Sequence, residues 1–172
     1  MAVPDFQTLM LPMLELAADG ATQSLADTRE RLAERFALTA TDRTQRVPSG
    51  RQTVLANRVA WARCYLGMAG LLETPEETPK RGRFRITGRG RDVLAHPPAR
   101  ITIRYLSQFP GFDDARRGGG ANTAIDAPGA GTVVPDEMLV SPDEALDRAY
   151  ASLRNAVAAE LLERLKAASS VF

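Results

Sequence analysis

The residues best suited to chemistry lie in a short polar stretch at the start of a helical pattern. They supply hydroxyl, guanidinium and amide groups and are Ser49, Arg51, Gln52, Thr53 and Asn57. Backbone N–H groups at a helix N-terminus favour a phosphate, and an asparagine can make a bidentate contact to the edge of an adenine. The stretch is therefore a candidate nucleic-acid-binding surface. The alternative interpretation is a helix face that is merely solvated.

A second group of side chains, further along the chain, is strongly basic. Four cations occur within six residues, namely Lys80, Arg81, Arg83 and Arg85. A strand over residues 83–87 would send Phe84 and Ile86 to one face and the two arginines to the other. Outward arginines on a hairpin can contact phosphates or the minor groove. Charge of this density sometimes serves only solubility.

Charge is unevenly distributed, although the formal net charge of the 172 residues is only +1. Residues 38–110 carry thirteen Lys and Arg against five Asp and Glu. The segments 1–37 and 111–172 are acidic, with net charges of −3 and −4. A basic middle between acidic ends is typical of a polyanion-binding face.

A helix from about Gln52 to Met68 would position the first group. Its apolar positions share one narrow arc and should be core: Leu55, Val59, Ala62, Leu66 and Ala69. The opposite arc holds Thr53, Asn57 and Cys64, which we expect to face outward. Arg58 lies near the edge of the core arc, where pairing with an acidic neighbour and contact with a phosphate are equally compatible with the pattern.

Further elements flank this helix. Asp5, Ser24 and Thr87 each precede a helical pattern in the position of an N-cap. Residues 71–73 and 83–87 predict a two-stranded basic hairpin. A helix followed by such a hairpin is typical of a winged helix. The expected fold is therefore mainly α with a small β-hairpin (α+β), forming a DNA-recognition domain over residues 1–112.

The rest of the chain has a different character. Residues 113–140 are rich in glycine and proline and predict a flexible linker. Ser141, Pro142 and Glu144 then carry the signature of a helix start. The following apolar positions recur every three or four residues, at Leu146, Tyr150, Leu153, Val157, Leu161 and Leu165. This amphipathic helix, within residues 141–172, cannot bury its stripe alone, so we expect self-association through it.

Composition excludes several classes of function. The single cysteine, Cys64, excludes an intrachain disulfide and a thiolate metal cluster. With only one histidine as well, His96, there is almost no material for a His/Cys metal site or a Cys–His catalytic pair. The carboxylates are scattered, so we expect no catalytic residue, no metal site and no cofactor within these residues. No signal peptide and no run of about 20 apolar residues is found. The sequence therefore predicts a cytoplasmic protein without a membrane partner.

Several stretches resemble a known family. They are Pro4 with the helical pattern of residues 9–14, then residues 48–73 (PSGRQTVLANRVAWARCYLGMAGLLE), 81–98 (RGRFRITGRGRDVLAHPP) and 105–112 (YLSQFPGF). Together they resemble the N-terminal domain of Mrr-type, modification-dependent (type IV) restriction endonucleases. Residues 141–169 resemble the segment that joins this domain to the nuclease domain. The resemblance implies that the chain recognises modified, methylated double-stranded DNA. It also implies a Mg²⁺-dependent nuclease domain, which we expect beyond Phe172.

Two other functions fit the same residues. A winged-helix transcriptional regulator with a C-terminal dimerisation helix would look similar, although the long linker argues against it. A protein-interaction module would show no salt-dependent binding of DNA.

Overall fold

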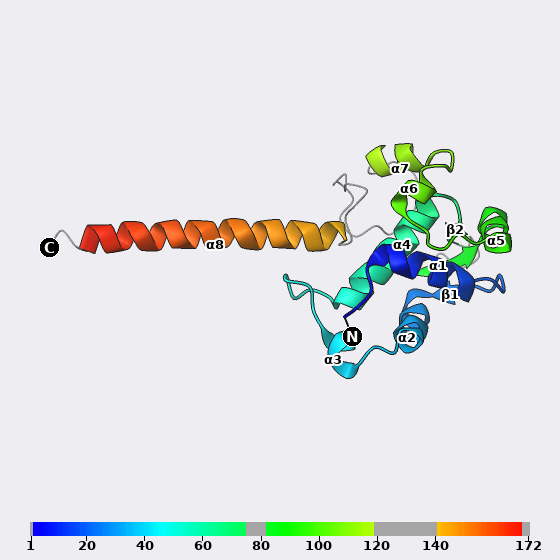
Figure 1. Cartoon of the computed structure of the whole chain (residues 1–172), viewed down its shortest axis with the longest axis horizontal. Helices are drawn as coiled ribbons and strands as arrows, with labels where there is room; N and C mark the ends of the chain where they lie inside the picture. Colours follow the sequence, from blue (N-terminus) through cyan, green and yellow to red (C-terminus); the bar gives the residue numbers. More distant parts are fainter. Residues whose placement is uncertain (1, 75–81, 119–140, 170–172) are drawn as a thin grey trace.

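The computed structural model describes residues 2–74, 82–118 and 141–169. Its helices are α1 (Phe6–Leu16), α2 (Leu25–Arg35), α3 (Ala40–Thr44), α4 (Val54–Met68), α5 (Gly88–Ala95), α6 (Ile103–Leu106), α7 (Phe112–Gly118) and α8 (Pro142–Ser169). The strands are β1 (Gln23–Ser24), β2 (Leu72–Glu73) and β3 (Arg83–Ile86). Helices predominate and one small antiparallel sheet accompanies them, so the α+β class is confirmed. Figure 1 shows α1 to α7 and the strands gathered in one body, with α8 extending away from it.

Capping side chains set where several helices begin. Asp5, Ser24 and Thr87 each accept a hydrogen bond from a backbone N–H in the first turn of α1, α2 and α5, over 3.0–3.1 Å. These N–H groups have no partner inside their own helix, so the caps stabilise the helix starts. The three predicted N-caps are confirmed.

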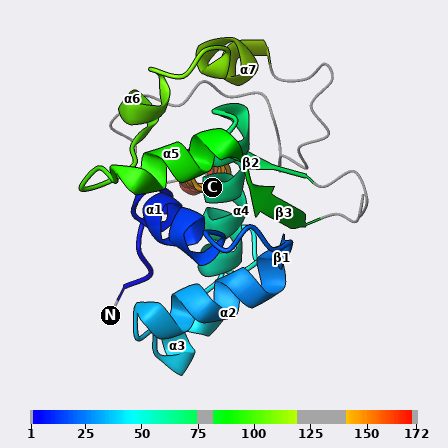
Figure 2. The ribbon, with the colours of Figure 1, turned by 90° about the vertical axis from the view of Figure 1, so that its right-hand side faces the viewer.

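Helix α4 forms the centre of the molecule. It packs against α1, α2, α3, β2, α6 and α7, and Figure 2 shows these elements arranged around it. On one side Tyr65 stacks on Phe6 with ring centroids 5.3 Å apart, and it also meets the rings of Trp61 and Phe112. The five predicted core positions of this helix are all buried.

The expectation that α4 also has an outward face is wrong for two of its three residues. Asn57 and Cys64 are both 0% exposed. Only Thr53, the N-cap of the helix, is half-buried. The cause is tertiary, because a central helix has neighbours on every side and its polar residues are covered along with its apolar ones.

The sheet has one strand more than the predicted hairpin. Its order is β1-β3-β2, with Ser24 opposite Arg83 and Leu72 opposite Ile86 in antiparallel register. β1 is only two residues long and immediately precedes α2, so it has no alternating pattern that a sequence could display. In β3 the predicted alternation is confirmed, since Phe84 and Ile86 are buried and the alternating arginines, Arg83 and Arg85, are half-exposed.

Gly90 allows α5 to approach the sheet closely. A Cβ added at this position would lie 2.4 Å from the carbonyl oxygen of Leu71 and 2.7 Å from Cγ1 of Ile86. Both distances are far below van der Waals contact, and one of them involves backbone that cannot swing away. Glycine is therefore required where α5 passes over Ile86 of β3 and over Leu71, the residue before β2.

The segment expected to be a linker begins with regular structure. Residues 113–118 belong to α7, which opens with two acidic residues and ends with two arginines. Such charges complement the helix dipole, which favours helix over irregular chain. The rest of the predicted linker, residues 119–140, lies outside the described residues.

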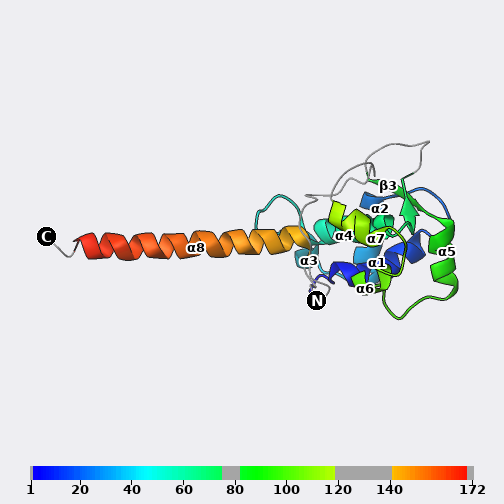
Figure 3. The same cartoon turned by 90° about the horizontal axis from the view of Figure 1, so that it is seen from above.

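Helix α8 begins as predicted and then leaves the rest of the molecule. Ser141 and Glu144 form a reciprocal capping box, because each accepts a hydrogen bond from the other's backbone N–H at 3.3 and 3.0 Å. Beyond the first turns the described residues are almost all exposed, and Figure 3 shows a straight rod. Seven large apolar side chains on it are 48–66% exposed: Leu146, Tyr150, Leu153, Val157, Leu161, Leu162 and Leu165. None of the helices within the described ranges has the length and apolar character needed to span a bilayer.

Candidate nucleic-acid interface

The loop that connects α3 to α4 carries most of the first predicted group. Ser49 and Arg51 are exposed, and Gln52 and Thr53 are half-buried. The loop folds back on itself, since the N–H of Val47 donates to the carbonyl of Gln52 at 3.1 Å and that of Gly50 donates to Val47 at 2.8 Å. It therefore holds its polar side chains in place at the N-terminal end of α4.

Thr53 has a structural task in this arrangement. Its hydroxyl oxygen accepts a hydrogen bond from the N–H of Ala56 at 3.2 Å and so caps α4. The sequence predicts that this side chain contacts nucleic acid. Capping engages one lone pair of its oxygen, so any contact with a ligand would have to share that oxygen.

Asn57 is placed differently from the expectation. Its side-chain oxygen accepts a hydrogen bond from the hydroxyl of Ser141, and its Nδ2 donates to Oδ2 of Asp143 at 2.9 Å. Both partners come from the start of α8. The prediction that Asn57 projects outward is wrong because these residues cover it.

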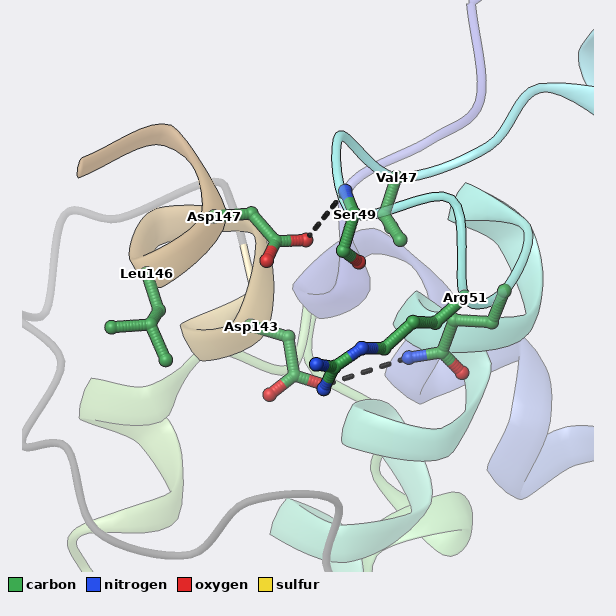
Figure 4. A pocket seen from close by; sticks show the side chains of 7 residues that line it. Val47, Ser49, Arg51, Asp143, Leu146 and Asp147 are labelled. Atoms are coloured by element: carbon green, nitrogen blue, oxygen red, sulfur yellow. Dashed lines mark hydrogen bonds between the residues drawn. The ribbon is translucent and has the colours of Figure 1, made fainter. Parts of the chain in front are cut away.

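A pocket of about 330 Å³ lies between the loop and the first turns of α8 (Figure 4). Its lining residues are Val47, Ser49, Arg51, Gln52, Asp143, Leu146 and Asp147. Across it the N–H of Ser49 donates to Oδ2 of Asp147 at 3.2 Å, and Nε2 of Gln52 donates to Asp143 at 3.5 Å. The Arg51 side chain extends toward Asp143 in the same view. Donors and cations of the loop thus meet carboxylates of α8.

Trp61 lies beside this meeting point. Its side chain is 4% exposed, and among the described residues its Nε1 is the buried side-chain polar atom without an aligned hydrogen bond. Burial raises the pKa of Asp143, while the neighbouring indole N–H, the Asn57 amide and Arg51 act to lower it. The charge on Asp143 is therefore partly desolvated in a setting of hydrogen-bond donors.

The strongest contact between α4 and α8 is an ion pair. Arg58 binds both oxygens of Glu144, with Nη2 to Oε1 at 2.8 Å and Nε to Oε2 at 3.0 Å. The same guanidinium donates to the carbonyls of Val3 and Pro4 at 2.6 and 3.1 Å. Burial raises the pKa of Glu144, but the hydrogen bonds from Arg58 and Ser141 outweigh it and hold the pKa below its usual range. Of the two roles left open for Arg58, the structure supports the acidic pairing.

The second predicted group is only partly visible. Lys80 and Arg81 lie outside the described residues. Arg83 and Arg85 are half-exposed, and Nε of Arg85 pairs with Oε1 of Glu73 on β2 at 2.6 Å. Nη2 of Arg63 donates to the carbonyl of Arg83 at 3.5 Å, so this strand lies beside the second half of α4. From the first residue of α4 to Arg63 is about 14 Å along the helix axis, so the two basic groups lie beside different parts of the helix.

Four residues of this site were not anticipated: Ser141, Asp143, Glu144 and Asp147. The sequence indicates a helix start there and nothing more, because contacts between residues 84 to 98 positions apart leave no local pattern. In the described ranges no cluster of three or more His, Cys, Asp or Glu could hold a metal ion. On the loop side the site offers hydrogen-bond donors and the Arg51 guanidinium, and in this structure they face the carboxylates of Asp143 and Asp147.

Comparison with known proteins identifies the family. The model of the Mrr N-terminal domain matches residues 6–96, more than half of the chain. The chain belongs to the Mrr N-terminal domain family. It is also 30% identical over 168 residues to the "Type IV methyl-directed restriction enzyme EcoKMrr" of Escherichia coli K12. That alignment covers 96% of this chain and 54% of the relative, so the chain spans about half the relative's length. No solved structure matches the chain.

The boundary of the Mrr N-terminal domain falls between the two sides of the pocket. The matched residues include the loop, α4 and the basic strand, whereas α8 lies beyond residue 96. The contacts of Arg58, Asn57 and Ser49 therefore join the family domain to a helix outside it.

Proposed function

We propose that the N-terminal domain is a winged-helix module that binds double-stranded DNA as part of a restriction system. The observation that carries the proposal is the loop before α4, which presents Ser49, Arg51 and Gln52 at the start of that helix. The elements follow the order α1, β1, α2 to α4, and then the hairpin of β2 and β3. This order agrees with a winged helix, as does the sheet order β1-β3-β2. In such folds the helix before the hairpin is the one that approaches DNA.

The basic strand provides a second point of contact in this proposal. Arg83 and Arg85 face away from the core, beside α4. An offset of about 14 Å along the helix is comparable with the roughly 12 Å width of the major groove. The loop and the strand can therefore each reach a phosphate backbone that borders one groove, which would fix the register of the domain on the duplex.

We further propose that the preferred duplex carries methylated bases. The support is the relationship to a restriction enzyme that is named methyl-directed. By the same relationship, the chain would serve a metal-dependent nuclease, with Mg²⁺ bound in a domain other than the residues described here. The family match favours this function over a transcriptional regulator.

The exposed stripe of α8 supports self-association, with a second copy of α8 as the occupant. Apolar residues on this helix recur eleven positions apart, as in Leu146 and Val157 or Tyr150 and Leu161. An eleven-residue repeat is typical of helix pairs that are nearly straight or coil slightly to the right. Two copies would bury the apolar side chains that share this face of each helix. Cutting both strands of a duplex is most simply served by a two-fold assembly.

The test is binding to labelled duplexes, methylated and unmethylated, at two salt concentrations. Replacing Arg83 and Arg85 by alanine should weaken binding to every sequence and flatten the salt dependence by about one unit of slope per lost phosphate contact. Arg154→Ala, which removes an exposed charge from the distal part of α8, is the matched control and should leave the slope unchanged. Equal slopes in all three proteins would contradict the proposed role of the strand.

A further inference from the structure

The loop before α4 already holds two anions, and both belong to this chain. Asp143 receives hydrogen bonds from Asn57 at 2.9 Å and from Gln52 at 3.5 Å, and Asp147 receives one from the backbone N–H of Ser49 at 3.2 Å. Both carboxylates come from the first two turns of α8. These turns thus lie on the residues expected to contact DNA.

The donors around Asp143 are of the kind that bind a phosphate. They are two side-chain amides, the Arg51 guanidinium that lies toward the carboxylate, and the nearby indole N–H of Trp61, which is buried without an aligned hydrogen bond. At Ser49 the donor is a backbone N–H, which is a common partner of DNA phosphates. A carboxylate and a phosphate oxygen accept hydrogen bonds in the same geometry and carry the same sign of charge.

We propose that the first two turns of α8 compete with DNA for this face, with Asp143 and Asp147 standing where two backbone phosphates bind. The inference rests on the proposed DNA-binding function and adds its regulation. Binding of a duplex at the loop requires these turns to leave. Their departure also uncovers Asn57, which then becomes available to a base edge.

The first two turns of α8 also carry the contacts that hold them against α4. Glu144 pairs with Arg58 through two hydrogen bonds, and Ser141 donates to Asn57 while capping α8. The apparent affinity for DNA equals the intrinsic affinity multiplied by the fraction of molecules in which the turns are released. Weakening the contacts of Glu144 and Ser141 with α4 should therefore tighten DNA binding, even though no residue that contacts DNA has changed.

A charge-neutral pair of variants tests this in the full chain. Ser141→Ala removes the cap and the bond to Asn57, whereas Ser152→Ala removes an exposed hydroxyl from the same helix. We expect Ser141→Ala to bind a labelled random-sequence duplex about tenfold more tightly than the unmodified chain, because the buried hydrogen bond to Asn57 exists only in the docked state and its loss weakens that state alone. Ser152→Ala should bind like the unmodified chain.

A second pair changes charge equally in two places. Asp143→Ala with Asp147→Ala removes two charges and their hydrogen-bond acceptors at the loop. Glu160→Ala with Glu163→Ala removes two charges from the exposed distal part of α8. The first pair should tighten binding about tenfold and the second less than twofold. If the first pair tightens binding but Ser141→Ala does not, the aspartates merely repel DNA, and the competition model is overturned.

Trp61 provides a readout of the turns themselves. It is the only tryptophan in the chain, so its indole N–H gives a single NMR signal. DNA should move this signal toward its position in the Ser141→Ala protein. A signal that stays in place while the duplex binds would overturn the inference and leave the proposed function intact. If neither the unmodified chain nor any variant binds duplex, the proposed function fails, and the inference fails with it.

Discussion

Helices α4 and α8 are the two longest described helices of the chain, and their surroundings are opposite. Leu66 of α4 is 0% exposed, whereas Leu153 of α8 is 64% exposed. The sequence predicted an amphipathic helix in both cases. The difference teaches that an apolar stripe indicates which residues need a partner, while the number of neighbouring elements decides how much of the helix is finally covered.

The largest expected effect compares a leucine from each helix. Leu66→Ala should lower the free energy of unfolding by about 2–5 kcal/mol because it opens a cavity in the core. Leu153→Ala should change it by less than about 0.5 kcal/mol at concentrations where the chain is monomeric. Urea denaturation followed by tryptophan fluorescence measures both values. Similar losses in the two variants would contradict the contrast between the helices.

The next prediction concerns the exposed stripe. Leu153→Glu with Val157→Glu should make the chain monomeric at concentrations where the unmodified chain sediments as a larger species, because charges would face the partner helix. Asn155→Glu with Ala159→Glu adds the same charge to the opposite face of α8, where every described residue is exposed. Sedimentation velocity should find this control as associated as the unmodified chain. If the unmodified chain is itself monomeric, the proposal that a second copy of α8 covers the stripe is wrong.

A smaller effect is expected where the two helices meet. The lowered pKa of Glu144 means that its ionised form stabilises the docked turn at neutral pH, and that this stabilisation is lost as the pH falls through the lowered pKa. The unfolding free energies of the unmodified chain and Glu144→Gln should therefore differ by about 1–3 kcal/mol at neutral pH and converge as the pH falls below the lowered pKa of Glu144.

The raised pKa of Asp143 acts in the opposite direction, since protonation of that carboxyl favours the docked turn. Comparison with Glu144→Gln cancels this contribution, because Asp143 is present in both proteins. Glu163→Gln, on the exposed part of α8, should show no pH-dependent difference. A gap that persists in acid would mean that Glu144 acts through packing rather than through its charge.

The smallest perturbation probes the covered side of α4. Cys64 is 0% exposed, and burial raises the pKa of its thiol to about 11. Because the thiolate is the reactive form, a thiol reagent should modify Cys64 only as fast as the domain opens. A chain carrying Cys64→Ser and Ser152→Cys, with its thiol on the exposed helix, should react at once. Rapid modification of Cys64 in the folded chain would show that this side of α4 is open.

Features that depend on near neighbours in the sequence could be predicted. The caps at Asp5, Ser24, Thr87 and Ser141 are local, since each pairs with a backbone N–H two or three residues away. The alternation in β3 and the core positions of α4 follow from the same short-range periodicity. The helix start at Ser141 was predicted for this reason, although its contact with α4 was not.

Features that depend on residues far apart in the sequence could not be predicted. The sequence placed Asn57 and Cys64 outside because helical geometry puts them opposite the apolar arc, but the cover over Asn57 comes from residues 84 and 86 positions later. The strand β1 was missed because two residues carry no period. The helix α7 was missed because the glycines that follow it dominated the composition of its segment.

The attachment of α8 through its first turns makes the rest of that helix a lever. Its 28 residues extend about 42 Å, and Arg58 holds them near one end. A tilt of about 10° at the anchored turns would carry the far end of the helix through roughly 7 Å, without any change within the rod. A rearrangement of a few hydrogen bonds at Glu144 and Ser141 is thereby converted into a displacement larger than the diameter of a water molecule. The size of this displacement depends only on the length of α8, so the amplification persists for as long as the helix remains unbroken.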